Sequence, residues 1–464
     1  MKEKTVQPVV KADGKLQHRF FWNWDHSTNW CLNTVGRQNC GVSNNYTKPA
    51  EEFVRDFTRM IDWCAAHGID AIGVVGLLRD CHGGEESVRR LCGYAREKGV
   101  RVYLIAGLYT YGGLWYEGDN KLSLNTFLQK NPQCIGKDLD GSPLYIRFRY
   151  PHGHRAQPMA CSSSREVNEY IVDALALLFM KIPELGGIQM ETGDCCPVCL
   201  CPRCRERRAA MQGGERVLPE ISLSDMACIY PEAANAVRSI SKDAWIICEN
   251  YLHFRENPVY ADKDNPSVQR LLTLPEGTFL QWGGDRRIKQ DIWKTTPILP
   301  EHFRKYHNIQ RFHRGTQWDG GRHTLAVDRI REMCRLSYTS GMDSISMFGE
   351  CSPFHANTEI NYLALQYFAD HPLNSVDQFA ADVMAGMLGG EGLAQEYLNF
   401  AVMNKTPEKI PAAEKRIAEI IGRTKDFQTL RRWTYLASFL HSYYWEHCQS
   451  DPSKTGEKIN LDFV

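Results

Sequence analysis

The sequence predicts a (β/α)8 barrel, and two observations support this fold class. Short apolar segments typical of strands alternate eight times with amphipathic helical segments along the 464 residues. Most of the strand-like segments end in an acidic, amide or aromatic residue, as barrel strands do at the face that carries an active site. A doubly wound open sheet is the alternative, but no strand-like segment is followed by a GxGxxG or phosphate-binding loop.

The expected strands are apolar runs bounded by glycine or polar residues. They span about 19–26, 69–76, 100–107, 186–191, 244–251, 278–285, 309–319 and 344–350. Helices are expected at about 47–67, 84–98, 164–182, 222–240 and 324–340, where apolar residues keep to one face. The helix near 164 begins with Ser163-Ser164-Arg165-Glu166, which resembles a capping box. Counting in order, Glu191 lies at the end of the fourth strand.

The same pattern divides the chain into parts. Residues 1–17 are polar and unpatterned, and we expect an N-terminal tail there. Residues 18–372 form the barrel, with a long loop at 108–162 after the third strand and a cysteine-rich loop at 195–204 after the fourth. Long loops in compact domains are usually functional or disordered, and the aromatic residues of 108–162 argue against disorder. Residues 373–464 show helical patterns only and predict a helical subdomain.

Composition excludes several classes of partner. Lys+Arg and Asp+Glu both number 55, so no net positive charge favours binding to nucleic acid or to an anionic membrane surface. No window reaches the roughly 18 to 20 apolar residues of a membrane span, and the N-terminus lacks the apolar run of a secretion signal. The 17 cysteines are mostly scattered singly, which predicts a reducing compartment and a cytoplasmic location.

Carboxylates gather where the expected strands end. Glu191 is the predicted general acid, and Asp285, Asp319 or Glu350 is expected to supply the base or nucleophile. Cleavage of a glycosidic bond needs one carboxyl group to protonate the leaving oxygen and a second to attack or to activate water. Asp194 also follows the fourth strand and is expected either to act on substrate or to orient the loop.

Aromatic and polar residues at the same strand ends suit a sugar, because flat apolar sugar faces stack on aromatic rings. The candidates for substrate binding are Trp24, Asp25, His26, Tyr109, Glu249, Asn250, Trp282, Trp318 and His323. His313 could also hold a sugar hydroxyl. The partner expected from this set is a small carbohydrate.

The loop after the fourth strand contains five thiols: Cys195, Cys196, Cys199, Cys201 and Cys204. Two CxxC units in a chain without a secretion signal are typical of a tetrahedral zinc site. Four thiolates leave no open position, so the expected zinc is structural. Free thiols or a local disulfide are the alternative. No organic cofactor is expected.

Several motifs resemble those of barrel glycoside hydrolases. Gly349-Glu350, Asn361-Tyr362-Leu363-Ala364, His371-Pro372 and 375–379 are similar to α-glucuronidases and β-N-acetylhexosaminidase-like bacterial enzymes. Two further stretches carry the likeness: the loop after the third strand (Asn131-Pro132, 137–141 and 160–162) and the CxCxxC run from Cys199 to Cys204. The resemblance covers most of 18–380 and implies a superfamily rather than a substrate.

The resemblance implies an exo-acting glycoside hydrolase with Glu191 as its acid. Hexosaminidases carry adjacent Asp-Glu at the end of strand four, whereas this chain has Met190-Glu191, which argues against acetamido-assisted cleavage. The basic residues within 147–155 would suit an acidic sugar. Two hypotheses from other classes stay open, namely a non-catalytic sugar-binding barrel and a metal-dependent barrel lyase or isomerase.

Overall fold

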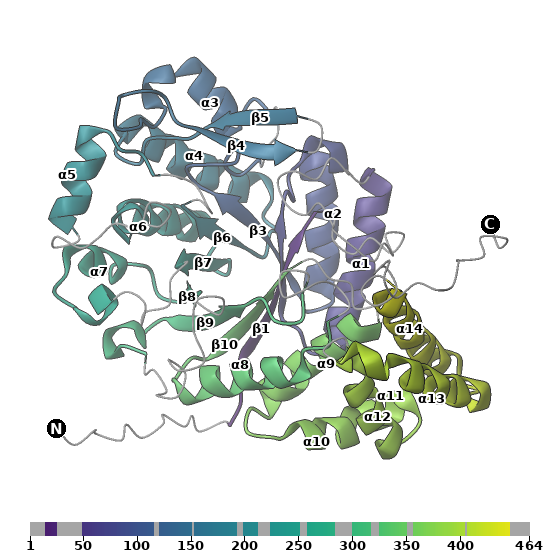
Figure 1. Ribbon diagram of the computed structural model, residues 1–464. Helices are drawn as coiled ribbons and strands as arrows, with labels where there is room; N and C mark the ends of the chain where they lie inside the picture. Colours follow the sequence, from purple (N-terminus) through teal and green to yellow (C-terminus); the bar gives the residue numbers. More distant parts are fainter. Residues whose placement is uncertain are drawn as a thin grey trace, which may run out of the picture.

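Eight parallel strands close into a barrel in the computed structural model, which confirms the predicted (β/α)8 fold (Figure 1). The structure describes residues 14–25, 49–115, 120–150, 153–192, 198–211, 223–250, 258–283, 299–316, 324–349, 356–403 and 406–445. The barrel strands are β1 (His18–Trp24), β2 (Ala71–Val75), β3 (Arg101–Gly107), β6 (Gly187–Glu191), β7 (Trp245–Asn250), β8 (Thr278–Trp282), β9 (His307–Phe312) and β10 (Ser344–Phe348). They pair in this order, and β10 closes the barrel on β1.

Each barrel strand is buried on both faces, as parallel strands covered by helices must be. Alternate residues separate into two apolar clusters. Phe20, Trp22 and Trp24 belong to the cluster inside the barrel, whereas Phe21 belongs to the cluster between the barrel and its helices. This alternation decides which strand residues face the barrel interior.

Helices cover the outside of the barrel (Figure 1). They are α1 (Ala50–Ala66), α2 (Gly84–Glu97), α4 (Arg165–Lys181), α5 (Pro202–Met211), α6 (Leu223–Ile240), α7 (Pro266–Leu271), α8 (Val327–Thr339) and α9 (Ala356–Asp370). The N-cap of α4 is Ser164, whose side chain accepts from the Val167 N–H. The cap is thus one residue later than the expected capping box, and Glu166 instead contacts the Ser164 hydroxyl. Within the described helices, none combines the length and the apolar character needed to cross a membrane.

The long segment after β3 has structure of its own, although the sequence predicted only a loop. It contains α3 (Leu124–Lys130) and an antiparallel hairpin of β4 (Tyr145–Tyr150) and β5 (Gly153–Pro158). In Figure 1 this hairpin lies over the edge of the barrel beside α4. The basic side chains of 147–155 fall outside the described part of the chain.

The C-terminal helices pack beside α9 (Figure 1). They are α10 (Val376–Phe379), a π-helical turn (Ala380–Met384), α11 (Ala385–Leu388), α12 (Glu391–Ala401), α13 (Ile410–Arg423) and α14 (Phe427–Tyr444). Their apolar side chains continue the cluster that lies between the barrel and its helices. Glu359 of α9 accepts from both Arg431 and Arg432 of α14, which joins the two parts by charge as well.

Candidate active site

Glu191 is the last residue of β6, the fourth barrel strand, as counting along the sequence predicted. Its neighbours Ile188 and Met190 face the outer helices, so the alternation turns Glu191 and Gln189 into the barrel. The Gln189 side-chain amide donates to Oε1 of Glu191 at 2.8 Å. Glu191 keeps 8% of its surface exposed. It is therefore a nearly buried carboxyl group at the mouth of the barrel.

Glu249 lies beside it on the next strand, β7. Met190 and Cys248 are partners in the parallel ladder, so the residues that follow them are also neighbours. Glu249 is fully buried, and Nη1 of Arg311 lies 2.9 Å from its Oε1. The side-chain amide of Gln281 donates to its other oxygen. Two inward carboxyl groups thus stand on adjacent strands, and one of them is ion-paired.

Tyr103 of β3 faces the barrel interior from the strand that pairs with β6. Burial, then Glu249 and Glu191, raises the pKa of Tyr103 well above its usual range. Its hydroxyl is buried and finds no hydrogen-bond partner among the described residues. A Cβ on Gly73 of β2 would lie 2.4 Å from the Tyr103 ring. The ring therefore fills the space that a side chain on β2 would otherwise take.

Aromatic rings of β1 and β10 form one wall of the barrel mouth. Trp22 and Trp24 meet edge to face with centroids 5.1 Å apart, and Trp22 stacks on Phe348 at 5.0 Å. The Arg311 guanidinium lies 4.8 Å from the centre of the Phe348 ring. The predicted position of Trp24 at the mouth agrees with this arrangement. All three rings are nearly buried, and Phe348 is covered by Trp22 and by Arg311, so the wall makes this part of the barrel mouth apolar.

Tyr111 belongs to the same inner cluster. Among the described non-glycine residues, it is the one with a positive φ, at 55°. A side chain in this backbone region carries a conformational cost, and such residues gather at ligand sites. The sequence did not predict a site role for Tyr111, Tyr103 or Arg311. For Arg311 the signal in the sequence was a charged residue inside an expected strand, whereas nothing in the sequence marked Tyr103.

Three residues predicted to bind substrate face the helices instead, which corrects the sequence interpretation. Trp282 is fully buried in the outer cluster, and its indole N–H donates to Asn308 at 2.9 Å. The Asn250 side chain accepts from the hydroxyl of Tyr260 at 3.3 Å. The third, Tyr109, is described next.

Tyr109 packs into the outer cluster beneath α4. Its hydroxyl donates to Asn168 at 2.9 Å, and burial raises the pKa of Tyr109 well above its usual range. Since Trp282, Asn250 and Tyr109 all face the helical layer, none presents a ring face or amide to the mouth.

Asp25 follows β1 and is engaged in a buried cluster of charge. Its Oδ2 lies 2.6 Å from Nε2 of His82 and 3.2 Å from Nε of Arg79. His82 is fully buried and stacks on Phe53, with ring centroids 4.4 Å apart. A carboxylate held this way ties the end of β1 to the turn after β2. It does not offer itself to a sugar hydroxyl, which corrects its predicted role.

Nine predicted residues lie outside the described part of the chain: His26, Asp194, Cys195, Cys196, Asp285, Trp318, Asp319, His323 and Glu350. His313 is described, and its ring lies 5.8 Å from that of Phe348 at the aromatic wall. The described site therefore consists of Glu191 and Glu249 with Tyr103, Arg311 and the wall.

A second cluster consists of four thiols. The sulfurs of Cys161, Cys199, Cys201 and Cys204 are all within 4.8 Å of one another and could hold a metal ion. Cys161 was not predicted as a ligand, because it follows β5, far from the other three in the sequence. The cluster thus joins the loop after β5 to the loop after β6, which corrects a ligand set drawn from 195–204 alone.

The thiols share protons and charge with one another. Contacts with Cys161 and then Cys199 hold the pKa of Cys204 far below its usual range. The reverse contacts, with Cys199 first and Cys204 second, raise the pKa of Cys161. Four sulfur atoms this close together could act as deprotonated ligands only around a cation, which would offset their mutual repulsion.

Polar contacts surround this cluster. The Lys137 N–H donates to the sulfur of Cys199 at 3.2 Å, and Arg208 donates to the Cys199 carbonyl at 2.6 Å. Arg208 is itself buried and pairs with Asp225 at 3.0 Å. Arg207 donates to the carbonyl of Ser162 at 3.0 Å. The buried Arg208 and the partly buried Arg207 both pair with Asp225 and tie the segments around the thiols together.

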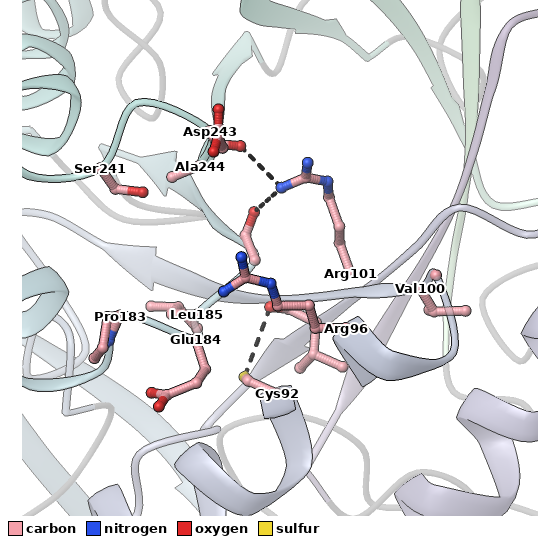
Figure 2. Close-up of a pocket in the computed structure, with 13 residues that line it drawn as sticks. Cys92, Arg96, Val100, Arg101, Pro183, Glu184, Leu185, Ser241, Asp243 and Ala244 are labelled. Atoms are coloured by element: carbon pink, nitrogen blue, oxygen red, sulfur yellow. Dashed lines mark hydrogen bonds between the residues drawn. The ribbon is translucent and has the colours of Figure 1, made fainter. Parts of the chain in front are cut away.

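A separate groove of about 260 Å³ lies at the opposite end of the barrel (Figure 2). Its lining includes Val100, Gly186 and Ala244, which precede β3, β6 and β7 or stand at their amino ends. Arg101 crosses it and donates to the carbonyl oxygens of Gly186 and Asp243 (Figure 2). Since barrel active sites lie at the carboxyl ends of strands, this groove is not the candidate site.

Comparisons with other proteins give weak likenesses only. The sequence matches no protein-family model and no curated protein. Three solved structures illustrate the likenesses found. The first is the maltogenic α-amylase AmyB from Thermotoga neapolitana, at 9% identity over 76% of each chain with a TM-score of 0.43.

The second is a cyclic α-maltosyl-(1→6)-maltose hydrolase from Arthrobacter globiformis in complex with maltose. It has 12% identity over 76% of this chain and 82% of its own, with a TM-score of 0.41. A glycoside hydrolase family 20 β-N-acetylglucosaminidase has 8% identity over 84% of this chain and 76% of its own, with a TM-score of 0.40. At this distance the (β/α)8 assignment depends on the strand pairing of the chain itself, and the chemistry must be argued from its own residues.

Proposed function

We propose that this protein is a glycoside hydrolase that acts on a small glycoside or oligosaccharide. One observation carries the proposal: Glu191 and Glu249 face the barrel interior from adjacent strand ends, beside a wall that contains Trp22, Trp24 and Phe348. Two carboxyl groups are the minimum chemistry of glycosidic cleavage. Aromatic rings next to them supply the surface on which a sugar is held.

Glu191 is the proposed general acid. Its Oε1 accepts from a neutral amide, Gln189, and it is nearly buried. Asp285, Asp319 and Glu350 are sequence-based candidates for the second carboxylate. Exo action and a preference for an acidic sugar are likewise proposals from the sequence.

We also propose that the four-thiol cluster holds one structural zinc ion. Four cysteine ligands and tetrahedral packing are typical of structural zinc sites, which have no open position for substrate. The buried Arg208 beside Cys199 would compensate the negative charge of a tetrathiolate centre. All ten described cysteines carry free thiols, which fits the reducing cytoplasm proposed from the sequence. Elemental analysis of the purified protein is expected to find zinc.

The test of the proposed function is a screen of aryl glycosides and oligosaccharides, followed by Glu191→Gln. The variant is expected to lose about 10²- to 10⁴-fold in kcat on the substrate found, with an unchanged Tm within a few degrees. Wild-type activity in Glu191→Gln would remove Glu191 from the mechanism. Binding of sugars without any product across the screen would instead identify a sugar-binding protein. Loss of activity on chelation, with folding intact, would favour a metal-dependent barrel enzyme.

A further inference from the structure

We infer that Gln189 is a positioning residue for Glu191 and that its side-chain amide reverses when Glu191 gains or loses a proton. The inference rests on the proposed function for the role of Glu191 as an acid, and it concerns a residue to which the sequence gave no role. Both residues belong to β6 and face the barrel interior. Nε2 of Gln189 donates to Oε1 of Glu191 at 2.8 Å.

The strands on either side of Gln189 place apolar side chains beside it. In the parallel ladder Gln189 pairs with Ile105 of β3 and with Ile247 of β7, and both isoleucines belong to the inner apolar cluster. Gln189 itself is fully buried. Burial of an amide costs free energy unless the amide is hydrogen-bonded, and methionine would fill a similar space without that cost. The contact with Glu191 therefore accounts for an amide at this position.

The other end of the amide has no competing partner. Oε1 of Gln189 is buried and accepts no hydrogen bond from the described residues. Among these residues, Glu191 is the one hydrogen-bond partner of the amide. Nothing else in this part of the chain fixes which end of the amide points at the carboxyl group. The orientation of the amide therefore depends on Glu191.

An amide can serve a carboxyl group in both of its protonation states. An ionised carboxylate only accepts, so it takes the Nε2–H of Gln189, which is the contact in this structure. A protonated carboxyl group also donates, so its O–H can donate to Oε1 once the amide has turned by half a revolution. The last side-chain torsion of glutamine is broad and nearly two-fold, and the reversal exchanges two groups of similar size. Gln189 can therefore hold Glu191 in one place in either state.

The proposed reaction takes the acid through both states in every turnover. The proton of Glu191 moves to the glycosidic oxygen as the bond between that oxygen and the anomeric carbon breaks. In the overall reaction, the hydroxyl part of a water molecule bonds to the anomeric carbon, and the remaining proton of that water restores Glu191. Gln189 turns once when the proton leaves and once when it returns. A carboxyl group held in this way stays aligned for the next substrate.

Charged and titratable groups from other elements also surround Glu191. Tyr103 of β3 and Tyr230 of α6 are electrostatically coupled to it, and burial raises the pKa of both well above the usual range, so both stay neutral near pH 7. Glu249 is its neighbour at the end of β7, and Nη1 of Arg311, on β9, lies 2.9 Å from Oε1 of Glu249. The titrations of the two carboxyl groups are therefore coupled.

Removal of the amide should move the titration of Glu191 to higher pH. A hydrogen bond to an ionised carboxylate is roughly twice as strong as one between neutral groups, so Gln189→Met weakens the ionised form more than the protonated form. We expect the midpoint to rise by about one pH unit. In the same variant kcat should fall about 10-fold, because the acid loses a contact that aligns it. A purely structural role would lower Tm without moving the midpoint.

Two measurements test the reversal without any substrate. In NMR spectra of the protein with isotopically labelled glutamine, the side-chain amide resonance of Gln189 is identified by its absence in Gln189→Met, or in Gln189→Glu if the first variant does not fold. In infrared difference spectra, the C=O stretch of protonated Glu191 is identified by its absence in Glu191→Gln. In the wild-type protein both signals are expected to change with the same pH midpoint. An amide resonance that does not respond, or a Glu191 that does not titrate in the folded protein, would overturn the inference.

Gln281→Met is the matched control. Gln281 is also fully buried, its amide donates to Glu249, and its Oε1 likewise has no hydrogen-bond partner among the described residues. The same substitution there leaves the contact between Gln189 and Glu191 intact, so the midpoint of Glu191 should move less than half as far. An equal move in both variants, or none in Gln189→Met, would contradict the inference. If no glycoside in the screen is cleaved, the proposed function fails, while the two spectroscopic midpoints still decide whether the amide follows Glu191.

Discussion

The hydroxyl of Tyr230 lies 2.9 Å from the carbonyl oxygen of Glu249. The same hydroxyl lies 3.0 Å from the carbonyl oxygen of Met190, the residue before Glu191. Tyr230 belongs to α6, so an outer helix holds the ends of β6 and β7 together from behind the two carboxyl groups. The separation of those groups depends on this contact as well as on the ladder itself.

Replacement of Tyr230 by phenylalanine is therefore expected to affect turnover more than stability. The change removes one buried donor and should cost about 1 to 3 kcal/mol in the free energy of unfolding. A small shift of a reacting group can lower kcat by up to about 10²-fold, so we expect a fall in that range, measured with the substrate from the screen. Tyr260→Phe loses a hydroxyl that donates to the outward Asn250, and equal losses in both variants would contradict the prediction.

Replacement of Cys161 by serine should remove the metal. Zinc content, measured by elemental analysis, is expected to fall from about one ion per chain to near zero, because a tetrahedral site loses one of its four ligands. Tm should fall at the same time, since metal affinity contributes to folding. Cys228→Ser is the control, as Cys228 donates weakly to the Ser162 carbonyl but is not part of the cluster. Equal zinc content in both variants would exclude Cys161 from the ligand set.

The pH dependence of stability should report on His18, at the amino end of β1. Its ring packs against Trp245 and Phe279, and burial lowers the pKa of His18, although Asp70 acts to raise it. A lowered pKa in the folded state means that folding favours the neutral ring. The stability that the neutral His18 ring contributes is therefore fully present above about pH 6.5. It is lost as the pH falls through the pKa of His18 in the folded state. His18→Asn should flatten Tm against pH below that value, and an unchanged slope would refute this account.

The contact between α9 and α14 should stabilise the C-terminal helices. Arg432 donates to both oxygens of Glu359, at 2.7 and 3.0 Å, and the pair is largely buried. Glu359→Gln removes the carboxylate charge that Arg431 and Arg432 share and is expected to cost about 2 to 3 kcal/mol. Limited proteolysis should then cut first before α14. Glu396→Gln breaks an exposed pair with Arg416 and serves as the control, with no change in Tm.

A methyl group at Gly73 should disturb the barrel interior. Its Cβ would lie 2.4 Å from the Tyr103 ring, so Gly73→Ala forces the ring to move and should cost about 1 to 3 kcal/mol. Gly93 of α2 has no atom within 4 Å of a built Cβ, and Gly93→Ala should stabilise by about 0.5 to 1 kcal/mol. The two Tm values are expected to move in opposite directions. Movement in the same direction would show that Tyr103 adapts without strain.

The fold and Glu191 could be predicted because they depend on order along the chain. Eight apolar segments alternating with helices define a barrel, and counting them places Glu191 at the end of the fourth strand. Trp282 shows the limit of prediction from the order of segments. A strand buried on both faces is apolar throughout, so its sequence gives the period of two but not which residues face inward. Trp282 was assigned to the mouth although its neighbour Gln281 is the inward residue.

Cys161 marks a second limit. The spacing of Cys199, Cys201 and Cys204 is local and can be read directly, whereas the fourth thiol arrives through the path of the loop that ends at α4. Arg311 was missed for the same reason, because its partner Glu249 belongs to another strand. Contacts between distant segments depend on the closed barrel, and the sequence predicts the barrel without predicting its side-chain pairs.

The Tyr103 ring occupies the space that a side chain at position 73 would need, and this arrangement has a use in engineering. No side chain of β2 can fall into the space if the ring is removed, so Tyr103→Ala would open a chamber of roughly one phenol inside the barrel. Engineered apolar cavities in other proteins take up small aromatic guests. Added phenol should then raise the Tm of that variant and leave the Tm of the wild-type protein unchanged. The variant barrel would then bind phenol in the space that the Tyr103 side chain occupies in the wild-type protein.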